Sequence, residues 1–267
     1  MMTNGWGGEE VEKLVSRSQK LIEFLSDSSS DLKARTYLSL ATYNNVRGNH
    51  DEVYRIINLA LSVNGLDLGI KSALYALKSH CLWCQGNFKN ALKYTKEARR
   101  LYVDELHHDH AEKFGHDTKV FALSLEALIF SSINDHDLAK LKIQESVKYA
   151  SSINSLHSLC MSKFYWCCCL YLKKDYYELK DTAESILDIC NSNNLANWGE
   201  VTNIIFSLIS GNAATAEESL FSLLETGATQ MQGFWNSIIS EIEINNGDID
   251  KANLRLKESI EQSIVVK

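Results

Sequence analysis

The chain lacks proline altogether, although it is 267 residues long. At the average usage of about 5%, roughly 13 prolines would be expected. Proline is the commonest helix breaker, because its ring clashes with the preceding turn and its nitrogen cannot donate a hydrogen bond. Its absence favours a largely helical chain whose corners are turned by other residues.

Several other features are also missing. No run approaches the 18 or more uncharged apolar residues of a membrane span, and residues 1–10 lack the basic flank and apolar core of a secretory signal. The net charge is −7 and the isoelectric point is near 5.6. Nucleic acid and anionic lipid need a basic footprint. We therefore expect neither a membrane association nor direct contact with nucleic acid.

The seven cysteines are odd in number, and Cys167–Cys169 lie together in an apolar helical stretch. Buried, reduced thiols fit this pattern better than a disulfide framework, and they indicate a cytoplasmic protein. Cys81 and Cys84 have the spacing of a redox dithiol but lie within a helix rather than at a strand-to-helix turn. Three consecutive helical cysteines point to different faces and cannot share one ion.

No catalytic or nucleotide-binding motif is present. The phosphate loops GxxxxGK[ST] and GxGxxG, the GxSxG elbow and the HExxH zinc motif are all absent. Asp and Glu follow helix surfaces and polar breaks, where solvation is their usual role. We therefore expect no enzymatic activity and no cofactor.

Polar breaks divide most of the chain into six segments, each with an apolar helix, a short break and a second helix. The breaks are 36 to 48 residues apart and begin at Gly48, Gly86, Asn134, Lys174, Gly211 and Gly247. Glycine or asparagine can end the first helix in the left-handed conformation, and the following Asn or Asp can cap the second. Small residues then let the paired helices approach closely: Ala91, Ala139, Ala216 and Ala252.

This pattern resembles the tetratricopeptide repeat (TPR), whose 34-residue unit has Gly at this turn and Ala in its second helix. The best copy is residues 86–92 (GNFKNAL), followed by residues 247–252 (GDIDKA). The resemblance implies an all-α fold: a right-handed α-solenoid of about six TPR-like helix pairs with an N-terminal capping helix. Residues 1–30 would hold the cap, an amphipathic helix from Glu9 to Leu25, and a linker from Ser26 to Ser30. Residues 31–267 would form the repeat domain.

An insertion between the second and third segments narrows the resemblance. Phe114-Gly115-His116-Asp117, followed by Val120 and an apolar helix, is similar to the entry of a repeat tail in large bacterial signalling proteins. These are the adenylate/guanylate cyclase-like and the LuxR- or winged-helix-type regulators, in which the tail follows an ATPase module. Trp198-Gly199 also fits, whereas Thr118 stands where that family has proline. The likeness covers roughly residues 70–262.

The same insertion is rich in histidine. Together with Asp109 it offers enough imidazole and carboxylate for a Zn or Ni site, through His107, His108, His110 and His116. It lacks the helical i, i+4 histidine pair of metalloproteases and has no cysteine close in sequence. We expect no metal site, and treat these four histidines as weak candidates. The alternative function is a metal- or thiol-responsive sensor that uses this loop and the cysteines.

In the repeat family the first helix of each pair lines a concave groove. That resemblance places seven residues on or near the groove: Asn45, His80, Trp83, Phe164, Tyr171, Trp198 and Phe234. Aromatic and amide side chains there suit capture of a peptide or helix, although each aromatic could instead belong to the core between repeats. We expect a non-catalytic scaffold or sensor with a regulatory role in signalling or transcription. Its partner would be a protein, a peptide or a small ligand, and a homodimer is left open.

Overall fold

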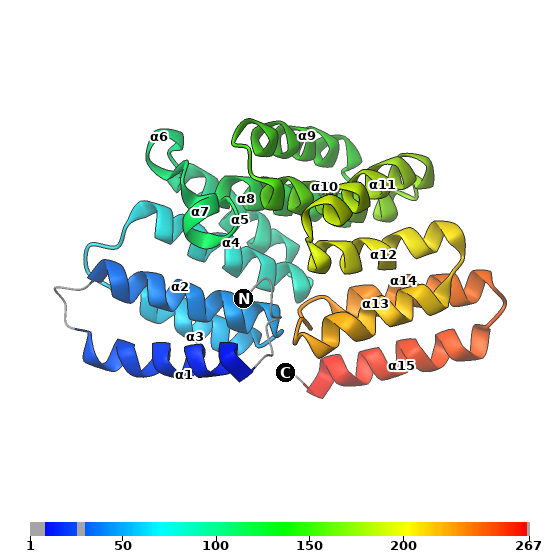
Figure 1. Ribbon diagram of the computed structural model, residues 1–267, viewed down its shortest axis with the longest axis horizontal. Coiled ribbons are helices and arrows are strands. Elements are labelled where there is room, and N and C mark those ends of the chain that lie inside the picture. The colour runs from blue at the N-terminus through cyan, green and yellow to red at the C-terminus, as the bar shows by residue number, and fades with distance from the viewer. Residues whose placement is uncertain (1–8, 26–29, 266–267) are drawn as a thin grey trace.

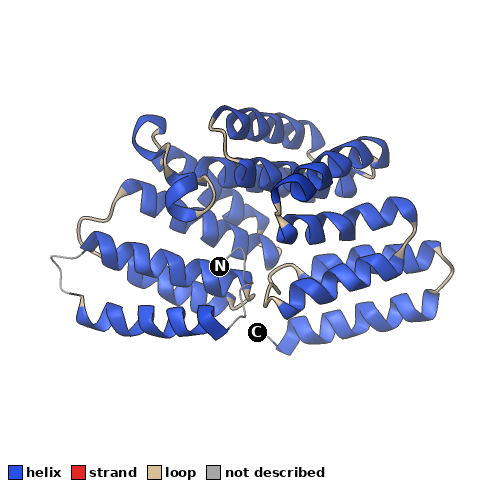
Figure 2. Ribbon diagram, viewed as in Figure 1, coloured by secondary structure: helices blue, strands red, loops and turns tan. Residues whose placement is uncertain are grey.

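The computed structural model describes residues 9–25 and 30–265. Within these ranges the chain forms fifteen helices and no strand (Figure 1), joined by short loops (Figure 2). The all-α prediction is confirmed. None of the described helices has both the length and the apolar character that a membrane crossing requires. The expected linker lies outside the described residues except for Ser30, where a helix begins.

Twelve of the helices form six consecutive pairs, and the two members of each pair contact each other. The pairs are α2 (Ser30–Val46) with α3 (His50–Leu61), α4 (Leu68–Cys84) with α5 (Phe88–Leu101), α8 (Thr118–Ser132) with α9 (His136–Ser152), α10 (Leu156–Lys173) with α11 (Tyr176–Asn193), α12 (Ala196–Ser210) with α13 (Ala213–Glu225), and α14 (Gln232–Asn245) with α15 (Ile249–Val265). The amphipathic helix α1 (Glu9–Phe24) precedes them, as expected. The short helices α6 (Asp104–His107) and α7 (His110–Phe114) form the insertion.

Each predicted break separates the two helices of a pair, and its first residue has a positive φ. Even Lys174 adopts this conformation, with φ of 63°. Four of the following Asn or Asp side chains accept a hydrogen bond from the backbone N–H three residues on: Asn87, Asp135, Asp175 and Asn212. Asn49 is an exception: its side chain makes no capping hydrogen bond to α3, and its Nδ2 donates to Asn44 Oδ1 (3.3 Å).

The small residues of the second helices are buried, with Ala91 and Ala216 at 0% exposure. Close approach also allows hydrogen bonds across a pair. Ser79 Oγ on α4 donates to the carbonyl of Ala91 on α5 (2.9 Å), and Ser72 Oγ donates to the carbonyl of Ala98 (2.7 Å). A larger side chain at Ala91 would push the paired helices apart.

The first helices of successive pairs also contact one another, in the order α2, α4, α8, α10, α12 and α14. The pairs follow an arc, so that the N-terminal helices and the C-terminal helices face each other across its open side (Figure 1). This arrangement brings the end of α2 next to the loop between α13 and α14.

The two ends of the arc are joined there by backbone hydrogen bonds, which we call the closure. The carbonyl oxygen of Val46 accepts from the backbone N–H of Thr229 (2.9 Å) and of Gln230 (3.1 Å). Asn45 Nδ2 donates to Gln230 Oε1 (2.9 Å) across 185 residues of sequence. A Cβ on Gly48 would lie 3.2 Å from Thr229 Oγ1, so this glycine permits the close approach.

Candidate functional site

A cavity of about 250 Å³ lies inside the arc, beside the closure. Its wall takes residues from the first helix of every pair, and also from the end of the insertion and from the α13–α14 loop. The exposed residues Asn194 and Ala196 line it as well, so the cavity reaches the surface at the turn between α11 and α12. Distant parts of the chain therefore build one site.

The structure brings four of the seven predicted groove residues into the cavity wall: Asn45, His80, Phe164 and Trp198. The other three, Trp83, Tyr171 and Phe234, do not line it. Phe234 packs against Trp83 (6.0 Å between ring centroids) and against Tyr171 (5.6 Å). These three rings pack α4, α10 and α14 together, so they belong to the core between helix pairs rather than to the cavity wall. Ligand contact by the four lining residues stays a prediction.

Four lining residues lie on a single stripe of α10: His157, Met161, Phe164 and Tyr165. Their spacing of four, seven and eight residues puts them on one face of a helix. Only Phe164 was expected at the groove, although this spacing could have predicted the other three. Gln230 and Met231 lie between α13 and α14, and they line the cavity because the closure holds this segment against α2. No pattern in the sequence predicts their position.

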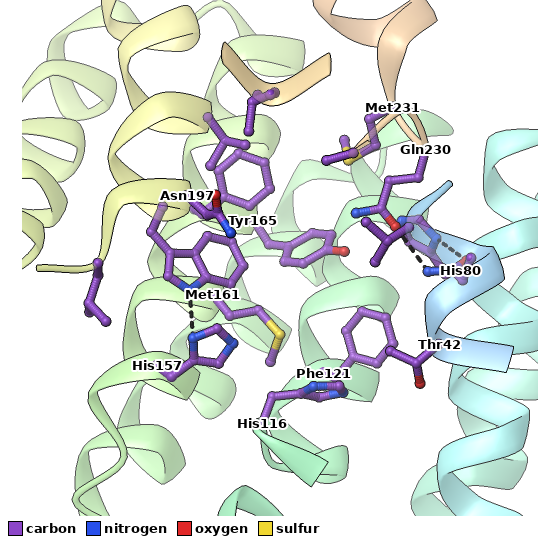
Figure 3. Close-up of a pocket in the computed structure, with 18 of the residues that line it drawn as sticks. Thr42, His80, His116, Phe121, His157, Met161, Tyr165, Asn197, Gln230 and Met231 are labelled. Carbon is purple, nitrogen blue, oxygen red and sulfur yellow. Dashed lines mark hydrogen bonds between the residues drawn. The ribbon is translucent and has the colours of Figure 1, made fainter. Parts of the chain in front are cut away.

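A chain of polar side chains crosses the closure at one side of the cavity (Figure 3). His80 Nδ1 lies 3.1 Å from Asn45 Oδ1, and Asn45 Nδ2 donates to Gln230 Oε1. Because an amide oxygen only accepts, His80 carries its proton on Nδ1 and its Nε2 is an acceptor. The amide nitrogen of Gln230 is the donor at the other end and has no hydrogen-bond partner within residues 9–25 and 30–265.

Two further histidines line the cavity. The Trp198 indole Nε1 donates to His157 Nδ1 (2.8 Å), and therefore His157 carries its proton on Nε2. His116 packs its ring against Phe121 (5.2 Å between centroids). Burial lowers the pKa of His80 to about 3, of His157 to about 3 and of His116 to about 4. All three imidazoles are neutral at physiological pH.

The Tyr165 hydroxyl points into the cavity, toward the side that holds His80 and Gln230 (Figure 3). The residue is only 5% exposed. Its ring packs against Phe164 (5.4 Å) and Phe121 (6.2 Å), while its hydroxyl has no hydrogen-bond partner in the described chain. Burial raises its pKa well above the usual value, so the hydroxyl keeps its proton. The hydroxyl can therefore form a hydrogen bond with a molecule that enters the cavity.

The lining as a whole is aromatic, aliphatic and neutral polar. Among the described residues, none of those that line the cavity is Asp, Glu, Lys or Arg, although 23% of the chain is charged. Binding sites for small molecules combine such apolar walls with a few placed polar groups. The arrangement suits binding of an uncharged molecule.

The histidines of the insertion are dispersed. His107 and His110 are buried, with ring centroids 5.0 Å apart, whereas His108 is exposed and His116 lines the cavity. His107 Nδ1 accepts from the Val103 N–H (2.9 Å), and His110 Nδ1 is paired with Thr118 Oγ1 (2.9 Å). Within the described ranges, no three His, Cys, Asp or Glu residues are placed to hold a metal ion.

Thr118 begins α8 at the position where the regulator family has proline. Asp117 caps this helix by accepting from the N–H groups of Lys119 (2.8 Å) and Val120 (3.0 Å). The cap starts the helix without the fixed backbone of proline. The threonine hydroxyl serves in addition as the partner of His110.

All seven cysteines are free, and six of them are buried. Burial raises the pKa of Cys84 to about 12 and of Cys169 to about 12, far above the range in which a thiol is reactive. Cys84 Sγ lies 3.9 Å from His80 Nδ1, but that nitrogen carries the proton donated to Asn45. The neutral imidazole therefore offers this thiol no base on that side.

Comparisons of the chain with protein-family models, with curated proteins and with solved structures find no match. What bears on function is therefore the geometry of the cavity and the chemistry of the side chains around it.

Proposed function

We propose that the six helix pairs form a right-handed α-solenoid of TPR-like repeats, with α1 as the N-terminal cap. The turn within each pair begins with a residue in the left-handed conformation, and the first helix of each pair contacts the first helix of the next. We also propose kinship with the repeat tails of the bacterial ATPase-linked regulators. The residues quoted for that likeness, from Phe114 to Val120, form the end of the insertion and the start of α8.

We propose that the protein is a non-catalytic sensor that binds a small ligand in the central cavity and acts in signalling or transcription control. The observation that carries this proposal is the uncharged cavity, whose wall is completed only where the two ends of the arc meet. Its cysteines are all free, which supports a location in a reducing compartment such as the cytoplasm.

The cavity volume favours a small ligand over a peptide or protein as its occupant. A dry cavity of about 150 Å³ in another protein holds benzene. On that scale, about 250 Å³ holds roughly ten non-hydrogen atoms. A peptide of several residues is too large for this space.

The closure supplies a mechanism for sensing. A ligand that touches α10 and α12 on one side and Gln230 on the other would favour the closed arc over an opened one. The ratio of the ligand's affinities for the closed and the opened arc sets how far this equilibrium shifts. A partner protein that binds only when the two ends of the arc are held at the closed distance would then respond to ligand binding in the cavity.

The test is a thermal-denaturation screen with neutral aromatic compounds of about 8 to 12 non-hydrogen atoms. We expect some of them to raise the melting temperature and to slow amide hydrogen exchange at Thr229 and Gln230, which donate to Val46. Val201→Phe, which fills the cavity wall, should abolish both effects. Leu141→Phe is the matched control, because Leu141 is exposed on α9. Equal stabilisation of both variants would contradict the proposal.

A further inference from the structure

The unpaired polar groups of the cavity restrict what it can hold. At its inner side, the Tyr165 hydroxyl and the Gln230 amide nitrogen are donors without partners in the part of the chain that the structure describes. His157 adds an N–H at Nε2, because its Nδ1 accepts from Trp198. These groups face the cavity rather than a protein acceptor, so a ligand oxygen that enters can accept from them.

The wall beside these donors is aromatic, with neighbouring rings tilted against one another. Phe164 lies between Trp198 (5.6 Å between ring centroids) and Trp235 (5.7 Å), and Tyr165 continues the row. Aromatic rings favour offset or edge contacts at such distances, with an energy beyond the burial of area alone. An aromatic ligand ring can add contacts of this kind, which a flexible aliphatic chain of the same size cannot.

The charge of the ligand follows from the lining. A carboxylate would enter a space whose wall, in the described chain, holds no Lys or Arg and whose imidazoles are kept neutral by burial. Its negative charge would lose hydration there, and neutral hydrogen-bond donors would offset only part of that cost. A cation could meet the aromatic faces, but the Gln230 amide N–H and the His157 Nε2–H groups would point their positive ends toward it.

We infer that the cavity binds an uncharged aromatic molecule that carries a carbonyl oxygen, and that the Tyr165 hydroxyl donates to this oxygen. This inference rests on the proposed function and names its ligand class: an aryl ketone, lactone, ester or amide of roughly ten non-hydrogen atoms. Gln230 is the second donor within the same wall, and it ties the carbonyl to the closure.

Four probes of nearly equal size test the inference. Acetophenone is neutral and carries the acceptor, isopropylbenzene lacks it, benzoate is an anion, and phenyltrimethylammonium is a cation. Affinities are measured by ligand-observed NMR up to about 5 mM, where weak fragment binding is visible. Acetophenone should bind about threefold to tenfold more tightly than isopropylbenzene. It should bind at least about 100-fold more tightly than benzoate, and more tightly than phenyltrimethylammonium.

Two variants assign the hydrogen bond. Tyr165→Phe removes the hydroxyl and should abolish the preference for acetophenone over isopropylbenzene, while isopropylbenzene still binds. Tyr177→Phe is the control, because Tyr177 is 83% exposed and its hydroxyl is remote from the cavity lining. A circular dichroism melt confirms that both variants fold.

The outcomes separate the two proposals. Failure of all four probes to bind would overturn the cavity as a ligand site, and with it the proposed function. Binding of isopropylbenzene as tight as that of acetophenone, tightest binding of either ion, or an unchanged preference in Tyr165→Phe would overturn the ligand class while the cavity remains a binding site.

Discussion

Lowering the pH from 7 to 5 should destabilise the folded chain strongly, because the fold holds several buried histidines in the neutral form. Burial lowers the pKa of His80 and His157 to about 3, and of His110 and His116 to about 4. In the unfolded chain these groups titrate near 6.5. Below that pH the unfolded state binds more protons, and so stability present above pH 6.5 is lost as the pH falls toward 4.

The magnitude follows from the two protonation states. Each histidine that stays neutral in the folded state lowers the free energy of unfolding by about 2 kcal/mol between pH 7 and pH 5, because it takes up a proton only in the unfolded state. His116 and His157 are partly exposed, so about 1 to 2 kcal/mol each is a fairer figure. With about 2 kcal/mol each for the buried His80 and His110, the four groups together give about 6 to 8 kcal/mol, which is comparable with the whole stability of a domain. The raised pKa of Asp117, also caused by burial, opposes this with a single group.

The assay is urea denaturation at half-unit steps between pH 7 and pH 5, with histidine Cε1–H NMR titrations as a direct check. His116 has no hydrogen-bond partner in the described chain, so His116→Leu removes its proton uptake without breaking a pair. It should reduce the slope of unfolding free energy against pH by about 1.4 kcal/mol per unit at most. Met161→Leu, a volume-conserving change in the same wall, should leave the slope intact. A flat profile from pH 6.5 to 5 would refute the reasoning.

Three further predictions concern packing and the thiols. Gly69→Ala should lower the free energy of unfolding by about 1 to 3 kcal/mol, because the new Cβ would lie 2.6 Å from His110 Nε2. Gly199→Ala should raise it by up to about 1 kcal/mol, because the nearest contact there is at 3.8 Å. Equal urea midpoints for the two variants would contradict this reasoning. Glu243→Leu should cost about 1 to 3 kcal/mol, because the fully buried carboxylate pairs with Arg255 at 2.8 Å, while Glu217 remains a partner of that arginine. A calorimetric melt should show partial recovery in the double variant with Arg255→Leu. The seven thiols should react with Ellman's reagent at pH 8 only after urea is added, and rapid labelling of several in native protein would favour the thiol-responsive alternative.

Helix pairing could be predicted from the sequence because it is set locally. A residue such as Gly86 or Asn134 can adopt positive φ, and the polar residue after it caps the next helix. The corners between successive pairs use the same conformation at Gly65, Asn154, Asn194 and Gly227, where no prediction was made. Their neighbouring residues vary, so no repeated motif marked them.

The cavity could be predicted only in part, because its wall depends on how the arc curves. His80 and Phe164 lie on first helices, and the repeat resemblance was enough to place them near the inner side. Trp83 has the same kind of position but packs against Phe234, because the arc curves tightly enough for α4 to meet α14. Gln230 belongs to the wall only through a contact with Asn45, 185 residues away. Local sequence carries no information about that contact.

The closure also constrains how many helix pairs this chain can have. In an open array each repeat contacts only its neighbours, so that units can be gained or lost with little effect on the rest. Here Val46 near one end must meet Thr229 near the other. An added or deleted helix pair would carry these groups apart, and would open the cavity that they complete. Gain or loss of a whole helix pair should therefore be disfavoured in this protein, and tolerated change should be confined to substitutions within the six described pairs.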